Sequence, residues 1–339
     1  MNPRNASADA SLPLIDLIKV LASQLILLHH FALYGPLSDV VNPTVPAVAD
    51  WLLDYGRLAV QAFLVVGGFL AARSFLQGPA AQGPAALPRQ LARRYRRLVP
   101  PYAVALAVAI VAAAVARWLI VHPTIPEAPS LWQVAAHLLL LQDIAGVAAL
   151  SAGIWYVSID FQLYAVFSAI ATRGRRQGLL LCAALTIAAL FWFNRHPGLD
   201  VWAPYFFGAY GLGAMAYRVS EQPRRMTGAL LLGAVVALAL VVEWRSRILV
   251  AGVTAVCLAL SGGQMGVPAA WRRVVARLSA ISYPLFLLHY PVLLVVGAVV
   301  HRLWPHSVAG SAAGLLGAWA LSLLAAQWLH QWVEAKSRR

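Results

Sequence analysis

The chain has 339 residues, of which 61% are hydrophobic and only 11% are Asp, Glu, Lys or Arg. Soluble domains carry about 25% charged residues, so this composition excludes a water-soluble globular protein. The net charge of +14 lies in short arginine clusters between apolar runs, which is typical of a membrane topology signal and argues against nucleic acid as a partner. Cys182 and Cys257 both lie within apolar runs, so we predict neither a disulfide framework nor a metal site.

Apolar runs of membrane-spanning length follow one another along the chain. A span needs about 20 apolar residues, and runs of this length form helices rather than strands in lipid. We therefore predict an all-α polytopic membrane protein. The first run contains Asp16 and Lys19 and is not followed by a small-residue cleavage site, so we expect it to remain as the first helix. The predicted spans, about ten in number, cover residues 12–34, 52–76, 98–120, 153–172, 178–193, 201–219, 226–243, 248–263, 279–301 and 309–333.

The basic residues orient these spans. With the N-terminus in the cytoplasm, 19 of the 26 Lys and Arg residues lie at inner ends and only five at outer ends, as the positive-inside rule favours. Both termini are then cytoplasmic, as tails over residues 1–11 and 334–339 of a single membrane domain that fills residues 1–339. A further crossing by the apolar stretch 131–150 would reverse the later clusters. We therefore predict that this stretch forms an interfacial or re-entrant helix.

The first predicted helix carries a polar stripe. At 100° per residue, an arc of about 60° holds Asp16, Lys19, Ser23 and His30. Lys19 and His30 are three turns apart, about 16 Å along the axis. Asp16 is expected to pair with Lys19, whereas His30 has no acidic neighbour on its own helix. A single membrane histidine more often packs or forms a hydrogen bond than catalyses, yet histidine is also the side chain suited to proton abstraction near neutral pH.

A run of arginines precedes the third predicted span. Arg93, Arg94, Arg96 and Arg97 come shortly before Pro100, which we place in the first turn of that helix. Arginines beside the free N–H groups of a helix N-terminus form a phosphate site. The alternative is a positive-inside anchor without a ligand. Arg97, which is nearest the predicted helix start, is the preferred ligand contact.

Polar residues also enter two later spans. The fourth span opens with the segment 155–164, in which Asp160 could orient a histidine or bind an acceptor sugar. A belt of interfacial aromatic residues would explain the tryptophan and tyrosines of this segment but not Asp160 and Gln162. In the ninth span His289 lies between two prolines, where a kinked helix with a structural histidine is an equal alternative to a functional role.

Four segments, in this order, resemble motifs of the acyltransferase-3 family of integral membrane O-acyltransferases. Lys19 and His30 match its Arg-or-Lys, ten residues, His signature. Residues 97–100 (RLVP) resemble its Arg-Ile-x-Pro element. Residues 155–164 (WYVSIDFQLY) are similar to its Trp-Ser-Leu-Ser-Val-Glu-x-Gln-Phe-Tyr segment, and residues 282–291 (SYPLFLLHYP) to its Ser-Tyr-x-Leu-Tyr-Leu-x-His-x-Pro helix.

The chain departs from these motifs in a few places. Asp160 stands where the family has Glu, which keeps the charge but shortens the side chain by one methylene. Gln61 and Gly67 replace the Asp and Ser that are common in the second-helix motif. No hydrolase-like domain follows the last helix in this sequence, so we expect the stand-alone membrane form of the family.

The resemblance implies an enzyme that passes an acyl group, acetyl being the expected one, from acyl-CoA to a hydroxyl of a glycan or glycoconjugate. The transfer is expected on the outer side of a bacterial inner membrane, with no permanently bound cofactor and acetyl-CoA as the donor. The expected catalytic residues are His30 and Asp160. The expected donor-binding residues are Lys19, Arg93, Arg94, Arg97 and Tyr102, and those for acceptor binding or support are Arg57, Trp155, Ser158, Gln162 and His289.

Two other functions use the same polar track. A transporter or flippase for a glycan or a lipid-linked precursor would use it as a permeation route, and inverted repeats or broken midplane helices would favour this function. The sequence shows no such symmetry. A structural subunit of a polysaccharide export complex would tolerate changes at His30 and Asp160. Consumption of acyl-CoA by the purified protein separates the enzyme from both alternatives.

Overall fold

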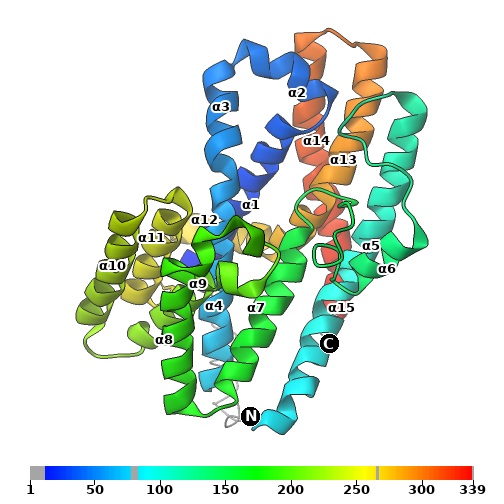
Figure 1. The fold of residues 1–339 in the computed structure, drawn as a ribbon. Coiled ribbons are helices and arrows are strands. Elements are labelled where there is room, and N and C mark those ends of the chain that lie inside the picture. The colour runs from blue at the N-terminus through cyan, green and yellow to red at the C-terminus, as the bar shows by residue number, and fades with distance from the viewer. Residues whose placement is uncertain (1–11, 78–82, 265–266, 338–339) are drawn as a thin grey trace.

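A computed structural model of the chain describes residues 12–77, 83–264 and 267–337, and these residues form helices and loops without a strand (Figure 1). The all-α prediction is thus confirmed for the described part of the chain. The helices are α1 (Pro13–Leu33), α2 (Pro36–Val41), α3 (Pro46–Tyr55), α4 (Ala59–Gln77), α5 (Leu87–Leu119), α6 (Leu131–Leu138), α7 (Trp155–Ala171), α8 (Arg175–Phe191), α9 (Ala203–Ser220), α10 (Arg225–Val242), α11 (Ser246–Ser261), α12 (Ala269–Ala280), α13 (Ser282–Leu303), α14 (Val308–Leu329) and α15 (Ala335–Ser337).

Among the described residues, seven helical segments are long and apolar enough to cross a membrane. They are Pro13–Leu33, Pro46–Leu76, Pro84–Leu119, Arg175–Arg195, Arg225–Val242, Ser282–Leu303 and Val308–Ser337. α11 is apolar but shorter, and α7 and α9 lie where further spans were predicted. The chain is therefore a polytopic membrane protein by length and composition of its helices, while the number of about ten crossings and the cytoplasmic termini remain predictions.

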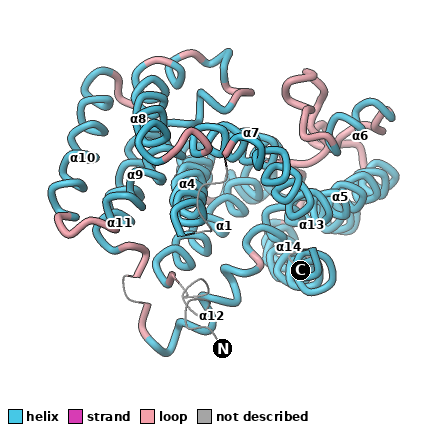
Figure 2. The backbone as a smooth tube through the Cα atoms, turned by 90° about the horizontal axis from the view of Figure 1, so that it is seen from below, coloured by secondary structure: helices cyan, strands magenta, loops and turns pink. Residues whose placement is uncertain are grey.

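The helices form two groups around a shared middle. Viewed from below, α8, α9, α10 and α11 gather on one side and α5, α13 and α14 on the other, with α1, α4 and α7 between them (Figure 2). α9 is buried along most of its length and packs against α4, α7, α8, α10 and α11. The contact with α4 depends on small residues, because a Cβ added at Gly68 would lie 1.8 Å from the Tyr210 carbonyl oxygen. Such small-residue contacts are typical of packed membrane helices.

α5 differs from the prediction at its start. It begins at Leu87 and runs through Pro100 and Pro101 to Leu119, so the arginines lie two to three turns inside the helix. The prediction that they flank free N–H groups at a helix N-terminus is wrong. The two prolines instead remove N–H donors and leave backbone carbonyl oxygens unpaired, and such acceptors would not attract phosphate. Any anion site here must rely on the guanidinium groups alone.

The stretch 131–150 contains only one short helix. α6 ends at Leu138, and a helix of eight residues rises only about 12 Å, which is too short to cross a bilayer. The predicted helix beyond this point is wrong, because residues 139–154 form a loop that turns back at Leu140, a non-glycine residue with φ of 59°. This loop leads directly into α7 and, as shown below, reaches the histidines.

The C-terminal segment also differs from the prediction of a tail from residue 334. α14 continues into a π-helical turn, His330–Glu334, followed by α15. Glu334 is buried, with 3% of its surface exposed. The residues after α14 are thus part of the helix bundle as far as Ser337. The predicted tail at residues 1–11 lies outside the described residues.

Candidate functional site

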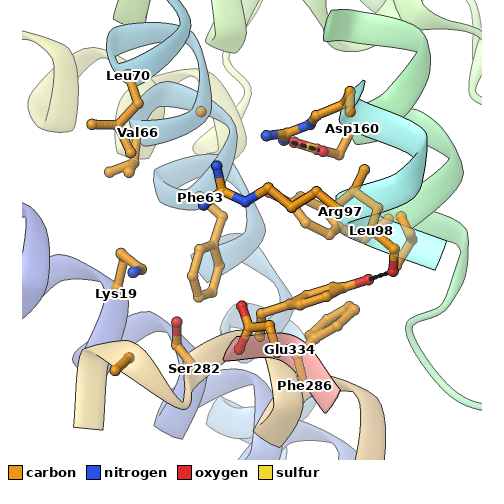
Figure 3. A pocket seen from close by; sticks show the side chains of 16 residues that line it. Lys19, Phe63, Val66, Leu70, Arg97, Leu98, Asp160, Ser282, Phe286 and Glu334 are labelled. Carbon is orange, nitrogen blue, oxygen red and sulfur yellow. Dashed lines mark hydrogen bonds and ion pairs between the residues drawn. The ribbon is translucent and has the colours of Figure 1, made fainter. Parts of the chain in front are cut away.

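A cavity of about 180 Å³ lies where α1, α4, α5, α7, α13 and the C-terminal π turn meet (Figure 3). Its polar wall holds three cationic side chains and two acidic ones. Its remaining wall is apolar and aromatic. The charged lining residues are Lys19, Arg94, Arg97, Asp160 and Glu334, and the others include Phe63, Val66, Gly67, Leu70, Tyr156, Ser282, Tyr283 and Phe286.

The acidic group predicted for catalysis is engaged by an arginine. Asp160 Oδ2 accepts a hydrogen bond from Arg94 Nη2 in an ion pair, and the Asp160 side chain is only 8% exposed (Figure 3). The guanidinium of Arg94 also lies over the Tyr164 ring, 5.0 Å from its centroid. Its Nε is buried and has no hydrogen-bond partner among the described residues.

The second part of the site is a pair of buried histidines. His30 Nδ1 lies 2.7 Å from His289 Nε2, and the two rings are nearly parallel, with 3° between their planes. α1 supplies one ring and α13 the other, so this contact joins residues that are 259 positions apart in the sequence. His30 is 8% exposed and His289 1% exposed. The sequence indicated both histidines but did not indicate that they bind each other.

Hydrogen bonding determines which nitrogen of His30 is basic. His289 Nδ1 lies 3.0 Å from the Leu285 carbonyl oxygen, which can only accept, so Nδ1 of His289 carries its proton. In the neutral ring Nε2 of His289 is then an acceptor. His30 therefore donates its Nδ1 proton to His289, and Nε2 of His30 holds the free lone pair. A backbone carbonyl thus orients a two-histidine chain whose terminal atom can take up a proton.

The loop before α7 packs against this pair. Gly153 adopts a φ of +77°, and a Cβ added there would lie 3.2 Å from His30 Cε1 and 2.9 Å from Phe286 Cζ. His29, the neighbouring histidine, bonds through Nδ1 to the Leu52 carbonyl oxygen at 2.8 Å instead. The two adjacent histidines of α1 thus have different environments, and only His30 joins the buried pair.

One aromatic layer separates the cavity from the histidine pair. Phe286 lines the cavity and lies one helical turn before His289 on α13, with 6.2 Å between the two ring centroids. Tyr156, also in the cavity wall, packs edge-on against Phe286 at 5.4 Å. The charged cavity and the neutral histidines are therefore neighbours along the bundle.

The other predicted residues fall into two groups. Lys19, Arg94 and Arg97 line the cavity, and their role in donor binding stays a prediction. Arg93 is exposed, and Tyr102 is buried with a hydroxyl that has no hydrogen-bond partner among the described residues. Asp16 accepts a hydrogen bond from Ser279 at 2.6 Å.

The residues predicted for the acceptor are not gathered at one point. Gln162 bonds to the Val201 carbonyl oxygen and to the Ala203 N–H at the start of α9, and Ser158 bonds to Gln142. Trp155 packs against Phe206 with 5.5 Å between ring centroids. Arg57 is exposed in the turn between α3 and α4, close enough to His29 for an electrostatic interaction.

Sequence reasoning missed Glu334, Tyr156 and Phe286 as parts of the site. Glu334 resembled a tail residue, since nothing in the sequence marks a π turn. The two aromatic residues lie inside recognised motifs, but their types alone are compatible with ordinary packing. Among the described residues no group of three or more His, Cys, Asp or Glu could hold a metal ion.

Comparison with known proteins tests the resemblance. A family model described as an acyltransferase domain, that of the acyltransferase-3 family, matches residues 12–323. The match covers nearly the whole chain, including both histidines and the Arg94–Asp160 pair, and it stops before the π turn. No curated protein and no solved structure matches the chain. With its apolar helices, its buried histidine pair and this match, the chain belongs to the acyltransferase-3 family of membrane acyltransferases.

Proposed function

We propose that this membrane acyltransferase moves an acetyl group from acetyl-CoA, reached from the cytoplasm, to a hydroxyl of a glycan or glycoconjugate on the outer side of a bacterial inner membrane. The observation that carries the proposal is the His289–His30 chain, because it leaves a buried, oriented lone pair on His30 Nε2. A general base of this kind is what a hydroxyl nucleophile requires. Family membership supports acyl transfer as the reaction class.

In the proposed reaction His30 Nε2 takes the proton of the acceptor hydroxyl while the hydroxyl oxygen attacks the thioester carbonyl carbon. The carbon–sulfur bond then breaks, and the departing CoA thiolate takes the proton from the His30 imidazolium. His289 acts as a positioning residue, since it accepts the Nδ1–H of His30 and holds the ring in one orientation. Both histidines return to their starting protonation states, so no cofactor is consumed.

The charged cavity is the proposed entry for the donor. Lys19 and Arg97 line it, and Asp160 holds Arg94 beside it. The thioester would enter from this cavity and pass the Phe286 layer to reach His30. Arg57, exposed near His29, is proposed to hold the acceptor on the other side.

The test is release of free CoA from acetyl-CoA by the detergent-purified protein offered a panel of envelope glycans. We expect His30→Ala to lower the rate about 10³-fold, within the range for loss of a general base. His29→Ala is the matched control, because it removes the adjacent ring while keeping the Cβ that packs on Gly56. It is expected to stay close to wild type. Normal turnover by correctly folded His30→Ala would contradict the mechanism, and no release by wild type with any donor or acceptor would contradict the function.

A further inference from the structure

A second cavity lies between α4, α7, α8 and α9, and its lining residues are all different from those of the cavity at Lys19. Its volume is about 730 Å³, which falls within the roughly 300–1,000 Å³ of typical small-molecule sites. None of the residues predicted for catalysis, for the donor or for the acceptor lines it. The proposed reaction therefore leaves this cavity without a role.

Most of the wall of this second cavity is apolar. Phe75 comes from α4, Phe167 from α7, Cys182 from α8 and Met215 from α9. The rings of Phe75 and Phe167 pack edge to face with 5.6 Å between their centroids, and Cys182 is buried, with 2% of its surface exposed. Such a wall favours a hydrocarbon chain, because apolar surface is stabilised when other apolar surface covers it.

Charged side chains line one end of the second cavity. Arg175 is the first residue of α8, Arg218 lies in the last turn of α9, and Glu221 follows that helix. Arg175 and Glu221 are exposed, and Arg218 is half-buried. Among the described residues, neither arginine side chain forms an ion pair or a hydrogen bond. This end of the cavity thus carries two cations and one carboxylate, an excess of one positive charge.

The combination of these two parts narrows the kind of ligand. A positive-inside anchor would explain arginines at this end without a ligand, but it would not explain why they border an apolar cavity of this size. A free phosphate would use the arginines alone, and a hydrocarbon would use the apolar wall alone. A phospholipid uses both, because arginine pairs with phosphate through charge-assisted hydrogen bonds. With both termini in the cytoplasm, as predicted, the arginines lie at the inner leaflet.

We propose that this cavity binds a glycerophospholipid of the inner leaflet, with the phosphate held by Arg175 and Arg218 and one acyl chain inserted between α4, α7, α8 and α9. The excess positive charge at the mouth complements the phosphodiester, and the apolar wall with Phe75, Phe167 and Met215 complements the chain. Lipid binding of this kind goes beyond the proposed function, since it requires neither donor nor acceptor.

The headgroup contact is tested by titrating the delipidated, detergent-purified protein with phosphatidylglycerol and measuring the bound fraction by native mass spectrometry. We expect Arg218→Ala to weaken binding about tenfold, as for the loss of a hydrogen bond to a charged group. Glu221→Gln is the matched control, because it removes the opposite charge from the same mouth, and it should bind at least as tightly as wild type. Wild-type affinity in Arg218→Ala would overturn the proposal. Should that variant fail to fold, the exposed Arg175→Ala is expected to weaken binding, and wild-type affinity there would overturn the proposal equally.

The chain contact is tested by filling the cavity from α7. Ala171→Phe adds a ring to the wall and is expected to weaken phosphatidylglycerol binding about tenfold, because an overpacked wall excludes the chain. Ala169→Phe is the control, since Ala169 is also half-buried on this helix but does not line the cavity. It is expected to bind as wild type does. Equal affinities in the two variants would overturn the proposal.

Two competitors distinguish a lipid from other phosphate-bearing ligands. Glycerol 3-phosphate carries the phosphate without the chains, and coenzyme A is the soluble product of the proposed reaction. We expect neither to displace phosphatidylglycerol at a concentration equal to that of the lipid. Displacement by glycerol 3-phosphate would indicate a site for free phosphate, and displacement by coenzyme A would assign the cavity to the donor. Either result would overturn the proposal.

Discussion

The two halves of the site, the cavity and the histidine pair, differ in the charge of their side chains. The cavity gathers five charged side chains of both signs, whereas the histidine pair is neutral and is satisfied by a single chain of hydrogen bonds that ends on a backbone carbonyl. Charges inside a membrane domain are costly unless they are paired, so the cavity compensates them within its own wall. Under the proposed function, this difference corresponds to two roles: the charged residues bind the donor, and a neutral, oriented ring transfers the proton.

Of the variants that test this difference between the two halves, we expect the largest effect from one in the charged cavity. Asp160→Ala should lower the free energy of unfolding by about 3 kcal/mol, because removing one partner leaves the Arg94 guanidinium buried and uncompensated. Thermal unfolding in detergent, followed by circular dichroism, measures this loss.

Two further variants distinguish charge compensation from packing at this pair. Asp160→Glu, which restores the residue of the family motif, is expected to remain close to wild-type stability. The double variant Arg94→Met with Asp160→Leu should unfold at a higher temperature than Asp160→Ala, since replacing both charges is often neutral. A double variant that is less stable than Asp160→Ala would show that an uncompensated charge is not the cause of the stability loss in Asp160→Ala.

At the neutral half, His289→Ala should lower kcat about 10²-fold with little change in KM for the donor. His289 touches His30 and not the proposed donor path, and outer partners of this kind typically contribute 10- to 100-fold. Steady-state kinetics with acetyl-CoA separate the two parameters.

The control for this variant is His289→Gln, whose amide oxygen can still accept the Nδ1–H of His30. We expect it to recover part of kcat, whereas His289→Phe, similar in shape but without an acceptor, should not. Equal rates for the Gln and Phe variants would mean that the ring supports His30 by packing alone.

Much of the fold could be predicted because helices that cross lipid appear in the sequence as long apolar runs. Residues 12–34 were predicted as the first span and form α1 at Pro13–Leu33, and residues 226–243 form α10 at Arg225–Val242. The start of α5 at Leu87 was missed, since the basic turns before Leu98 are helical without being apolar. A hydropathy pattern identifies only the part of a helix that faces lipid or the protein core.

The sequence allowed single residues of the site to be predicted, but not the contacts between them. Lys19, His30 and Asp160 attract attention because buried polar groups need a reason. Their partners could not be predicted from spacing, because Arg94 and Asp160 are 66 positions apart and come from different helices. The π turn that turns Glu334 inward has no sequence signal in a single chain.

The smallest effect is expected where the two halves meet. Gly153→Ala adds a methyl group 2.9 Å from Phe286 Cζ and 3.2 Å from His30 Cε1, at a φ of +77° that side chains rarely adopt. The shift forced on these rings should lower kcat about tenfold, since a displacement of about 1 Å can cost up to 10²-fold. Gly146 provides the matched control: it lies in the same loop with a φ of +64°, and an added Cβ there meets nothing within 4 Å. Gly146→Ala should therefore show the same backbone cost, about 1 kcal/mol of stability, with wild-type kcat. Equal kcat values for the two variants would mean that the loop does not position His30, and the histidine pair would then depend on α1 and α13 alone.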